Sequence, residues 1–540
     1  MSVAEIETPE APENQPGRKS SGLVKNSLIN SFFTLISRFM GMARDIVITA
    51  VIGASGNIAA DAYNTALSFP NLFRRIFAEG AFTAAFVPSY SAVLVQEGPE
   101  AADKLARDAM ATLCFATVTL TIAAQLAMPW LMHVINPGFA DNPAKFKLCI
   151  VLTQISMPYL PCMAIVALLS GVLNARGRFI VSAAVPTLLN LIMLVMVLPQ
   201  KDPVAGAWWA SAGILLAGTA QAALLVWATR RTGARISLSV MPRLTPDIKK
   251  LLLLAVPGAL AASATQINVF VSGIFASQID GARSWLTVAD RLYQLPLGMV
   301  GVAIGVALLP ALSRAVQAGD HEGAQKTMDN ALIYSMVFTL PAAAALVSIP
   351  FFLIDGLYTR GIFYATDARA TADALLHYGW GVPAFVLSRI LSPAFYARKN
   401  TFGPMKFALV NVVVNLVVGI GMFHLIGVPG LAVGTSAGAW ANVLLMFISL
   451  HRRGMWRLSV RSTSALAKIL ICGVLMGAFL AVCSHLRPNI EAFIGGFAPV
   501  LHKEIAIVGV CFAGLFVYIA FLFVTGAVRP AELKAALRRG

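Results

Sequence analysis

Arginines within long apolar stretches are the residues of this 540-residue chain whose chemistry stands out. They are Arg38, Arg44, Arg74, Arg75, Arg291 and Arg389. The first five lie near three carboxylates, Asp45, Glu79 and Asp290, so the positive charges exceed the negative ones by two. A guanidinium stays charged at neutral pH and donates two parallel hydrogen bonds, which suits phosphate. This pattern therefore favours a site for a phosphorylated anion.

Structural ion pairs are an alternative explanation for part of this pattern. Arg75 and Glu79 are four residues apart, a spacing that lets them pair on one helix face. Arg38 and Arg44 are six apart and face different directions on a straight helix, although Gly41 between them permits a bend or a close helix contact. Arginines near the ends of spans can also extend their heads to the membrane surface.

The composition places these arginines in a membrane protein. The chain is 58% hydrophobic and 12% charged, with a mean hydropathy of +0.76, whereas a soluble domain is about one quarter charged. A span needs roughly 20 apolar residues. Fourteen stretches meet this need, so we expect an all-α polytopic protein of about 14 transmembrane helices. They are 24–52, 66–95, 109–135, 148–173, 179–199, 204–229, 250–279, 285–312, 328–355, 372–397, 404–426, 429–450, 465–485 and 503–527.

The basic residues predict the orientation. The net charge is +16, and most of the 41 Lys and Arg residues fall in segments on one side, including 230–250 and 451–468. Cytoplasmic loops carry such an excess, so both termini are predicted to be cytoplasmic and a nucleic-acid partner is not expected. Residues 1–21 read as a disordered cytoplasmic tail without the apolar core of a signal peptide, and 531–540 as a second tail.

An internal repeat divides the spans into two halves. Ser170 and Arg176 recur, with the same spacing between them, as Ser392 and Arg398. At nearly the same offset along the chain, Asn190 recurs as Asn415 and Pro70 as Pro296. This offset equals six spans, which predicts two tandem lobes with a site between them near mid-membrane. The expected domains are an N-terminal lobe at 22–235, a C-terminal lobe at 236–455 and a helix pair at 456–530.

Signatures of catalysis and of cofactor binding are missing. The chain has no Gly-Lys dipeptide and therefore no Gly-x-x-x-x-Gly-Lys-Ser/Thr loop for ATP. The seven histidines lack metal-ligand spacing, and the six cysteines lie in apolar spans without Cys-x-x-Cys pairs. We expect no catalytic residue, no metal and no cofactor, which leaves a transporter as the default class.

The chain resembles the MurJ (MviN) family of lipid II flippases, within the multidrug and oligosaccharidyl-lipid exporter superfamily. The resemblance runs from about residue 22 to 527. Its densest stretches are "SRFMGMARD" at 37–45, "AADAYNTALSFPNLFRRIFAEGAFTAAFVP" at 59–88, "PGFAD" at 137–141, "ADRLYQLPLGMVGVAIGVALLP" at 289–310 and "SPAFYARKNTFGPMK" at 392–406. It implies two lobes around a V-shaped cavity, with the last helix pair lining a groove for a lipid tail.

The resemblance also implies the substrate and its site. The substrate would be lipid II, the undecaprenyl-pyrophosphate-linked disaccharide pentapeptide, flipped from the cytoplasmic to the periplasmic leaflet of the bacterial inner membrane for peptidoglycan and cell-wall synthesis. Family cavity positions match Arg38, Arg44, Asp61, Asn71, Arg74, Ser284 and Arg291, and the charge pattern adds Arg75 and Glu79. Asp61 is expected to contact sugar or peptide or to gate the cavity. Gln294 stands where relatives often have a glutamate.

Other functions share some of these features. An exporter of another polyprenyl-linked glycan would use the same arginines, whereas a cation-coupled drug exporter of the same fold would favour carboxylates and aromatic residues. A polyprenyl-phosphate transferase should show an acidic metal-binding cluster such as Asp-Asp-x-x-Asp, which the chain lacks. Membrane lipids are the expected surroundings and a monomer is the expected state, while partners in the cell elongation or division machinery stay open.

Overall fold

The computed structural model describes residues 20–75, 82–234, 236–237, 241–242, 244–398, 400, 402–499 and 501–527. These residues form helices and no strand, as expected for an all-α membrane protein. The helices are α1 (Ser20–Ile52), α2 (Ala59–Phe73), α3 (Phe82–Gln96), α4 (Pro99–Ile135), η2 (Pro137–Phe139), α5 (Pro143–Ser156), α6 (Tyr159–Ala175), α7 (Phe179–Val197), α8 (Pro203–Arg231), α9 (Pro246–Ala276), α10 (Ala282–Gln317), α11 (His321–Ser348), α12 (Pro350–Tyr358), α13 (Ala365–Gly379), α14 (Val382–Tyr396), α15 (Phe402–Ile426), α16 (Val428–Arg452), α17 (Val460–His485), α18 (Arg487–Gly495) and α19 (His502–Val524).

Each predicted span overlaps one helix or two consecutive helices. In the described part of the chain, nine helical segments are long and apolar enough to cross a membrane, so the count of fourteen stays a prediction. The span predicted at 66–95 corresponds to α2 and α3, and residues 76–81 between them lie outside the described residues. Helix α18 was not predicted because Arg487 and Glu491 make its short sequence too polar for a span.

The internal repeat is visible in equivalent helix breaks. α5 and α6 are separated at residues 157–158, and α13 and α14 at residues 380–381, an offset close to that of the repeated side chains. The repeated arginines also make equivalent contacts. Arg176 donates to the Thr232 carbonyl at 3.5 Å and Arg398 to the Met455 carbonyl at 2.9 Å, just beyond α8 and α16 respectively. The two halves therefore use the same local connections.

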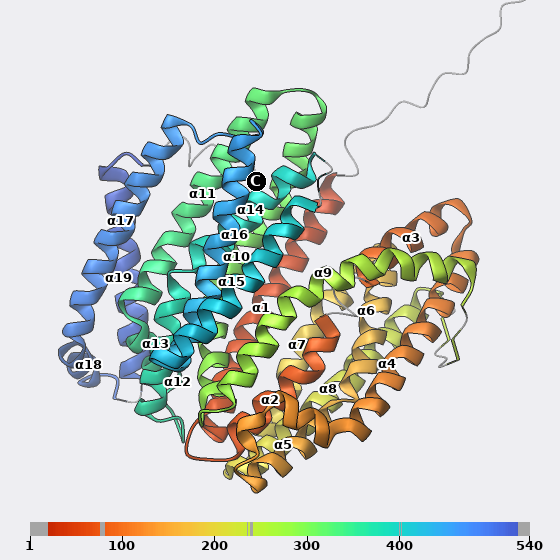
Figure 1. Cartoon of the computed structure of the whole chain (residues 1–540), viewed down its shortest axis with the longest axis horizontal. Helices are drawn as coiled ribbons and strands as arrows, with labels where there is room; N and C mark the ends of the chain where they lie inside the picture. Colours follow the sequence, from red (N-terminus) through yellow and green to blue (C-terminus); the bar gives the residue numbers. More distant parts are fainter. Residues whose placement is uncertain are drawn as a thin grey trace, which may run out of the picture.

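Two lobes meet at one end of the molecule and diverge at the other (Figure 1). We call α1–α8 the first lobe and α9–α16 the second lobe. Their helices converge where α2 and α5 lie, which we call the closed end. At the opposite, open end lie the start of α1, the end of α8, the start of α9 and residues 453–459. α17 and α19 pack along the outer side of the second lobe, against α11 and α12.

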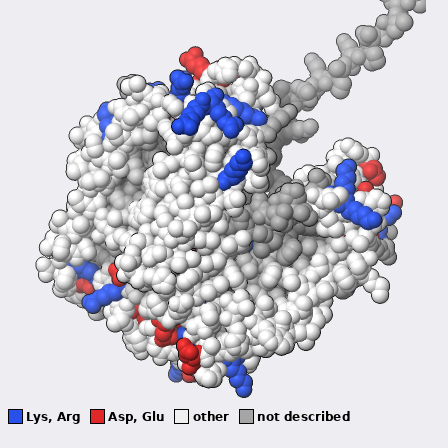
Figure 2. Space-filling model, in the orientation of Figure 1, with Lys and Arg blue, Asp and Glu red and all other residues white. Residues whose placement is uncertain are grey.

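The surface has the charge distribution of a membrane protein. Lys, Arg, Asp and Glu side chains gather at the two ends, and a broad band between them is free of charge in the view of Figure 2. Large apolar side chains are exposed on helices of that band, among them Leu409, Val417, Val474 and Phe516. Apolar groups are stable there because the surrounding lipid is apolar as well.

Helices α15 and α16 pack so closely that their contact depends on glycine. A Cβ on Gly434 would lie 2.4 Å from the Gly419 Cα and 2.6 Å from the Asn415 carbonyl oxygen. Backbone cannot yield as a flexible side chain can, so Gly434→Ala should cost about 1–3 kcal/mol, as overpacking typically does. We expect a lower melting temperature in detergent. Gly421→Ala is the matched control on α15, because no described atom lies within 4 Å of its Cβ position, and equal melting of the two variants would contradict the prediction.

Candidate functional site

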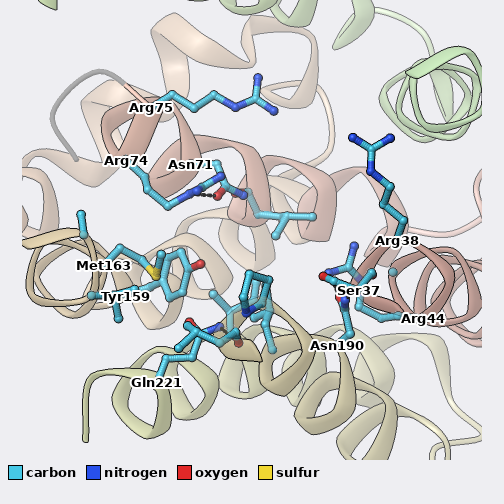
Figure 3. Close-up of a pocket in the computed structure, with 18 of the residues that line it drawn as sticks. Ser37, Arg38, Arg44, Asn71, Arg74, Arg75, Tyr159, Met163, Asn190 and Gln221 are labelled. Carbon is cyan, nitrogen blue, oxygen red and sulfur yellow. Dashed lines mark hydrogen bonds between the residues drawn. The ribbon is translucent and has the colours of Figure 1, made fainter. Parts of the chain in front are cut away.

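A cavity of about 640 Å³ lies between the lobes. Among the described residues that line it, all but four belong to the first lobe, and those four are Arg291, Gln294, Leu295 and Tyr358. The polar and charged residues of its wall are Ser37, Arg38, Arg44, Asp45, Asn71, Arg74, Arg75, Tyr159, Ser170, Asn174, Ser182, Asn190, Gln221, Arg291, Gln294 and Tyr358. Figure 3 shows how several of these side chains face one another across the cavity.

One carboxylate joins two of the arginines across the lobes. Asp45 on α1 accepts from Arg44 at 2.6 Å and lies 3.2 Å from the Arg291 Nε on α10. The buried Arg44 also donates to the Asn190 Oδ1 on α7 at 2.9 Å, and the Asn190 Nδ2 donates to the Ser37 carbonyl at 2.9 Å. Arg44 is therefore held in a fixed orientation by neighbours on two helices.

The other arginines surround the cavity from different helices (Figure 3). The Arg74 Nε donates to the Asn71 Oδ1 at 2.9 Å, one turn earlier on the same helical segment. Arg75 follows it and is exposed. On the other side, the guanidinium of Arg38 packs against the backbone of α10, where a Cβ on Gly298 would lie 1.9 Å from its Nη1. Glycine at 298 therefore makes room for Arg38.

The lining carries a surplus of positive charge. Five arginines and one carboxylate, Asp45, are found among the described lining residues, a surplus of four. Arg38 and Arg75 make no ion pair with any carboxylate that the structure describes. Arginines away from water are costly unless they face an anion or a water-filled cavity. The arrangement is therefore suited to a multiply charged anion.

The closed end is sealed by buried charge between the lobes. The Lys145 Nζ, at the start of α5, lies 2.8 Å from Asp61 of α2 and 2.7 Å from Asp280 of the second lobe. Asp61 is 0% exposed and also accepts from the Gly281 amide at 2.9 Å and from the Ser284 Oγ at 3.4 Å. Gly281 has φ +80°, a conformation that favours glycine.

Further hydrogen bonds join the lobes at the same end. The Asn64 Nδ2 donates to the Ser284 Oγ at 2.8 Å, and the Arg283 Nη2 donates to the Ile135 carbonyl at 2.9 Å. The Ser55 amide donates to Asp367 at 3.2 Å. These bonds hold the two lobes together at this end of the molecule.

The structure brings six of the predicted site residues together. They are Arg38, Arg44, Asn71, Arg74, Arg75 and Arg291, all in the cavity wall. Asp61 and Ser284 lie at the closed end and not in the cavity wall, where Ser284 donates to Asp61 and Asp61 pairs with Lys145. Their contact with substrate stays a prediction, as does gating of the cavity by Asp61. Glu79, and with it the predicted Arg75–Glu79 pair, lies outside the described residues. Gln294 lines the cavity and donates to Asp290.

Lys145, Tyr159 and Gln221 were missed by sequence reasoning. A charged residue ends an apolar stretch, so the predicted span began at 148, beyond Lys145. Asn142 and Pro143, a helix-start signal, would have placed Lys145 in a first helical turn.

Among the described residues, no group of three or more His, Cys, Asp or Glu side chains is arranged to hold a metal.

Known proteins resemble this chain in sequence and in fold. The family model "Lipid II flippase MurJ" matches residues 48–499. A probable lipid II flippase MurJ of Rhizobium tropici is 36% identical over 96% of this chain and 97% of its own length. A lipid II flippase MurJ of Burkholderia cenocepacia is 34% identical over 81% of this chain and 85% of its own length.

Solved structures share the arrangement of the helices. A lipid II flippase MurJ in an inward closed conformation superposes with a TM-score of 0.74 at 21% identity, covering 93% of this chain and all of that one. An inward-facing multidrug resistance transporter of the MATE family has a TM-score of 0.65 at 14% identity and covers 79% of this chain and 97% of its own. At these identities the likeness concerns the fold.

Proposed function

The chain belongs to the lipid II flippase MurJ family, and we propose that it moves lipid II across the membrane by presenting the arginine cavity to each side in turn. It is a multi-pass membrane protein and a transporter. The observation that carries the mechanism is the surplus of four positive charges in the described cavity wall. The diphosphate of lipid II carries at least two negative charges, and guanidinium groups bind phosphate oxygens in pairs.

Arg38, Arg44, Arg74 and Arg291 are the proposed ligands of the diphosphate. Arg44 and Arg291 share Asp45, which fixes their positions in the cavity wall. Arg74 and Arg75 approach from the end of α2 and Arg38 from α1 (Figure 3). Such a ring surrounds a diphosphate from several sides, while the polyprenyl tail stays in the lipid. We propose that the tail lies along the helix pair of residues 456–530, where α17 and α19 expose apolar side chains.

The open end is proposed to face the cytoplasm. The sequence is rich in Lys and Arg at 230–250 and 451–468. The end of α8, the start of α9 and the start of α17, which belong to these stretches, lie at that end, as do the start of α1 and the end of α19 (Figure 1). Cytoplasmic loops carry such an excess of positive residues. In this orientation both termini are cytoplasmic, the cavity accepts substrate from the leaflet in which it is made, and the Asp61–Lys145 network closes the periplasmic side.

Movement between the two states requires the lobes to rock about the cavity. A ligand shifts such an equilibrium only by binding one state more tightly than the other. Surplus positive charge inside the membrane also couples to the membrane potential, at about 2.3 kcal/mol per charge per 100 mV if the charge crosses the whole field. We propose that one chain acts as a monomer, since a single chain contains both lobes.

Externally exposed lipid II tests the proposed function. In bacterial cells depleted of their own flippase, expression of this chain should restore lipid II in the outer leaflet, measured with an impermeant reagent or a lipid II-cleaving toxin. Growth should return with it. A chain that inserts at normal levels but fails to restore exposure would instead point to an exporter of another polyprenyl-linked glycan, which the same arginines suit.

A further inference from the structure

Two buried polar groups of the first lobe have no role in the arginine network. Gln221 on α8 is 2% exposed and lines the cavity. Its Nε2 donates to the Val185 carbonyl on α7 at 2.7 Å, but its Oε1 has no hydrogen-bond partner among the described residues. Burying an acceptor without a partner is unfavourable, and in native proteins such an atom calls for an explanation. A ligand that donates a hydrogen bond in the cavity would provide one.

Tyr159 stands beside it, at the start of α6. The residue is buried except toward the cavity, which it lines, and in Figure 3 its hydroxyl points to the interior, on the side of Arg74 and Gln221. Its ring rests on α8, where a Cβ on Gly218 would lie 2.6 Å from the Tyr159 Cδ2. The glycine therefore sets the ring back against the wall and leaves the hydroxyl at the cavity surface.

The internal repeat shows that the fold does not need polar groups at these places. The offset of the Ser170/Ser392 and Arg176/Arg398 pairs sets Tyr159 opposite Gly381, and the offset of Asn190/Asn415 sets Gln221 opposite Met446. Gly381 has no side chain, and Met446 is a buried apolar residue. The same helices thus pack well in the second lobe without a phenol or an amide. The polar pair is a property of the first-lobe wall and not of the architecture.

We propose that Tyr159 and Gln221 form a subsite for the uncharged sugar attached to the diphosphate, with the Gln221 Oε1 accepting from a hydroxyl or acetamido N–H of that sugar. This inference rests on the proposed function. The sugar is bonded to the diphosphate, so it must lie next to the arginines, and the wall around Tyr159 adjoins Arg74 (Figure 3). A phenol and an amide suit an uncharged sugar because they donate and accept hydrogen bonds without adding charge to the cavity. The head group would then enter with its sugar against the first lobe.

Binding of two lipids to the purified full chain tests the subsite. The probes are lipid II and undecaprenyl diphosphate, which share the anion and the tail but differ in the head group. Tyr159→Phe keeps the ring against Gly218, and Gln221→Met keeps the length of the side chain. Loss of two neutral hydrogen bonds should weaken lipid II binding by the double variant about tenfold to a hundredfold and leave undecaprenyl diphosphate binding unchanged.

The control and the two lipids separate the possible failures. Gln154→Met removes an equivalent amide, which donates to the Gln125 carbonyl at 3.1 Å outside the cavity lining, and should change neither affinity. Equal weakening for both lipids, or unchanged lipid II binding in a folded double variant, would overturn the sugar subsite and leave the proposed function intact. Absence of lipid II binding by the unaltered chain would instead count against the proposed function.

Discussion

Arg74→Ala should abolish the appearance of lipid II in the outer leaflet while the protein still folds and inserts. Arg74 lies in the cavity wall and is oriented by the Asn71 side chain at 2.9 Å. A hydrogen bond to a charged group contributes about 1.5–3 kcal/mol, so loss of a bidentate contact with the diphosphate should cost about 3–5 kcal/mol. Because about 1.4 kcal/mol is a tenfold change, binding should weaken by about 10² to 4 × 10³.

The measurement compares exposed lipid II at matched membrane levels in cells depleted of their own flippase. Arg74→Lys keeps the charge and loses the planar fork, so an intermediate result is expected. Arg231→Ala is the control: this arginine stacks on Trp227 at 4.3 Å at the end of α8, outside the cavity lining, and its loss should leave exposure unchanged. Normal exposure by Arg74→Ala would contradict its proposed role, and normal growth after removal of three of Arg38, Arg44, Arg74 and Arg291 would refute the arginine site.

The sequence predicts the arginine site well because lipid penalises isolated charge. Arg38, Arg44, Arg74 and Arg291 fall in apolar stretches, where a charged side chain needs a reason, and the internal repeat indicates that the stretches surround a common centre. The structure then places all four in the lining of one cavity. What the sequence does not give is the partner of each charge. Asp45 bridges Arg44, its neighbour in the chain, and Arg291 of the other lobe, and no local spacing encodes that second contact.

Residues whose role depends on a distant neighbour were missed for the same reason. Lys145 is one basic residue near a helix start until folding places it on Asp61, far earlier in the chain. Gln221 looks like a minor interruption of an apolar helix, and only the three-dimensional structure shows that its Oε1 has no partner among the described residues. Apolar stretches located the spans but not their breaks, since four predicted spans each cover two helices. α18 shows the converse, since a short polar helix has no hydropathy signal.

Loss of the Lys145 charge should open the closed end. In Lys145→Met the carboxylate of Asp61, 0% exposed, keeps the Gly281 amide and Ser284 but loses its direct ion pair with Lys145. Removal of one partner from a buried ion pair costs about 3–5 kcal/mol. The side chain of Asp280 is 53% exposed and can be solvated, so Asp61 bears most of this cost. The cost falls on the state in which the lobes meet at this end, and the population of that state should fall by about 10² or more.

A cross-link between Asn64→Cys and Ser284→Cys reports this population, because the side chains at these positions are 2.8 Å apart across the lobes when the end is closed. After cleavage at a protease site added within 232–245, the two lobes separate on a denaturing gel unless the cross-link joins them. The chain with only its six native cysteines gives the background of cross-linking.

We expect slow cross-linking in Lys145→Met and partial recovery in Lys145→Met/Asp61→Asn, since the neutral amide no longer needs a cation. Lipid II exposure should fall and recover in parallel, because a cavity that rarely opens to the donor leaflet seldom loads. If Lys145→Met cross-links as fast as its parent, the buried ion pair does not hold the lobes together, and the hydrogen bonds of Arg283 and Ser55 must suffice to close this end.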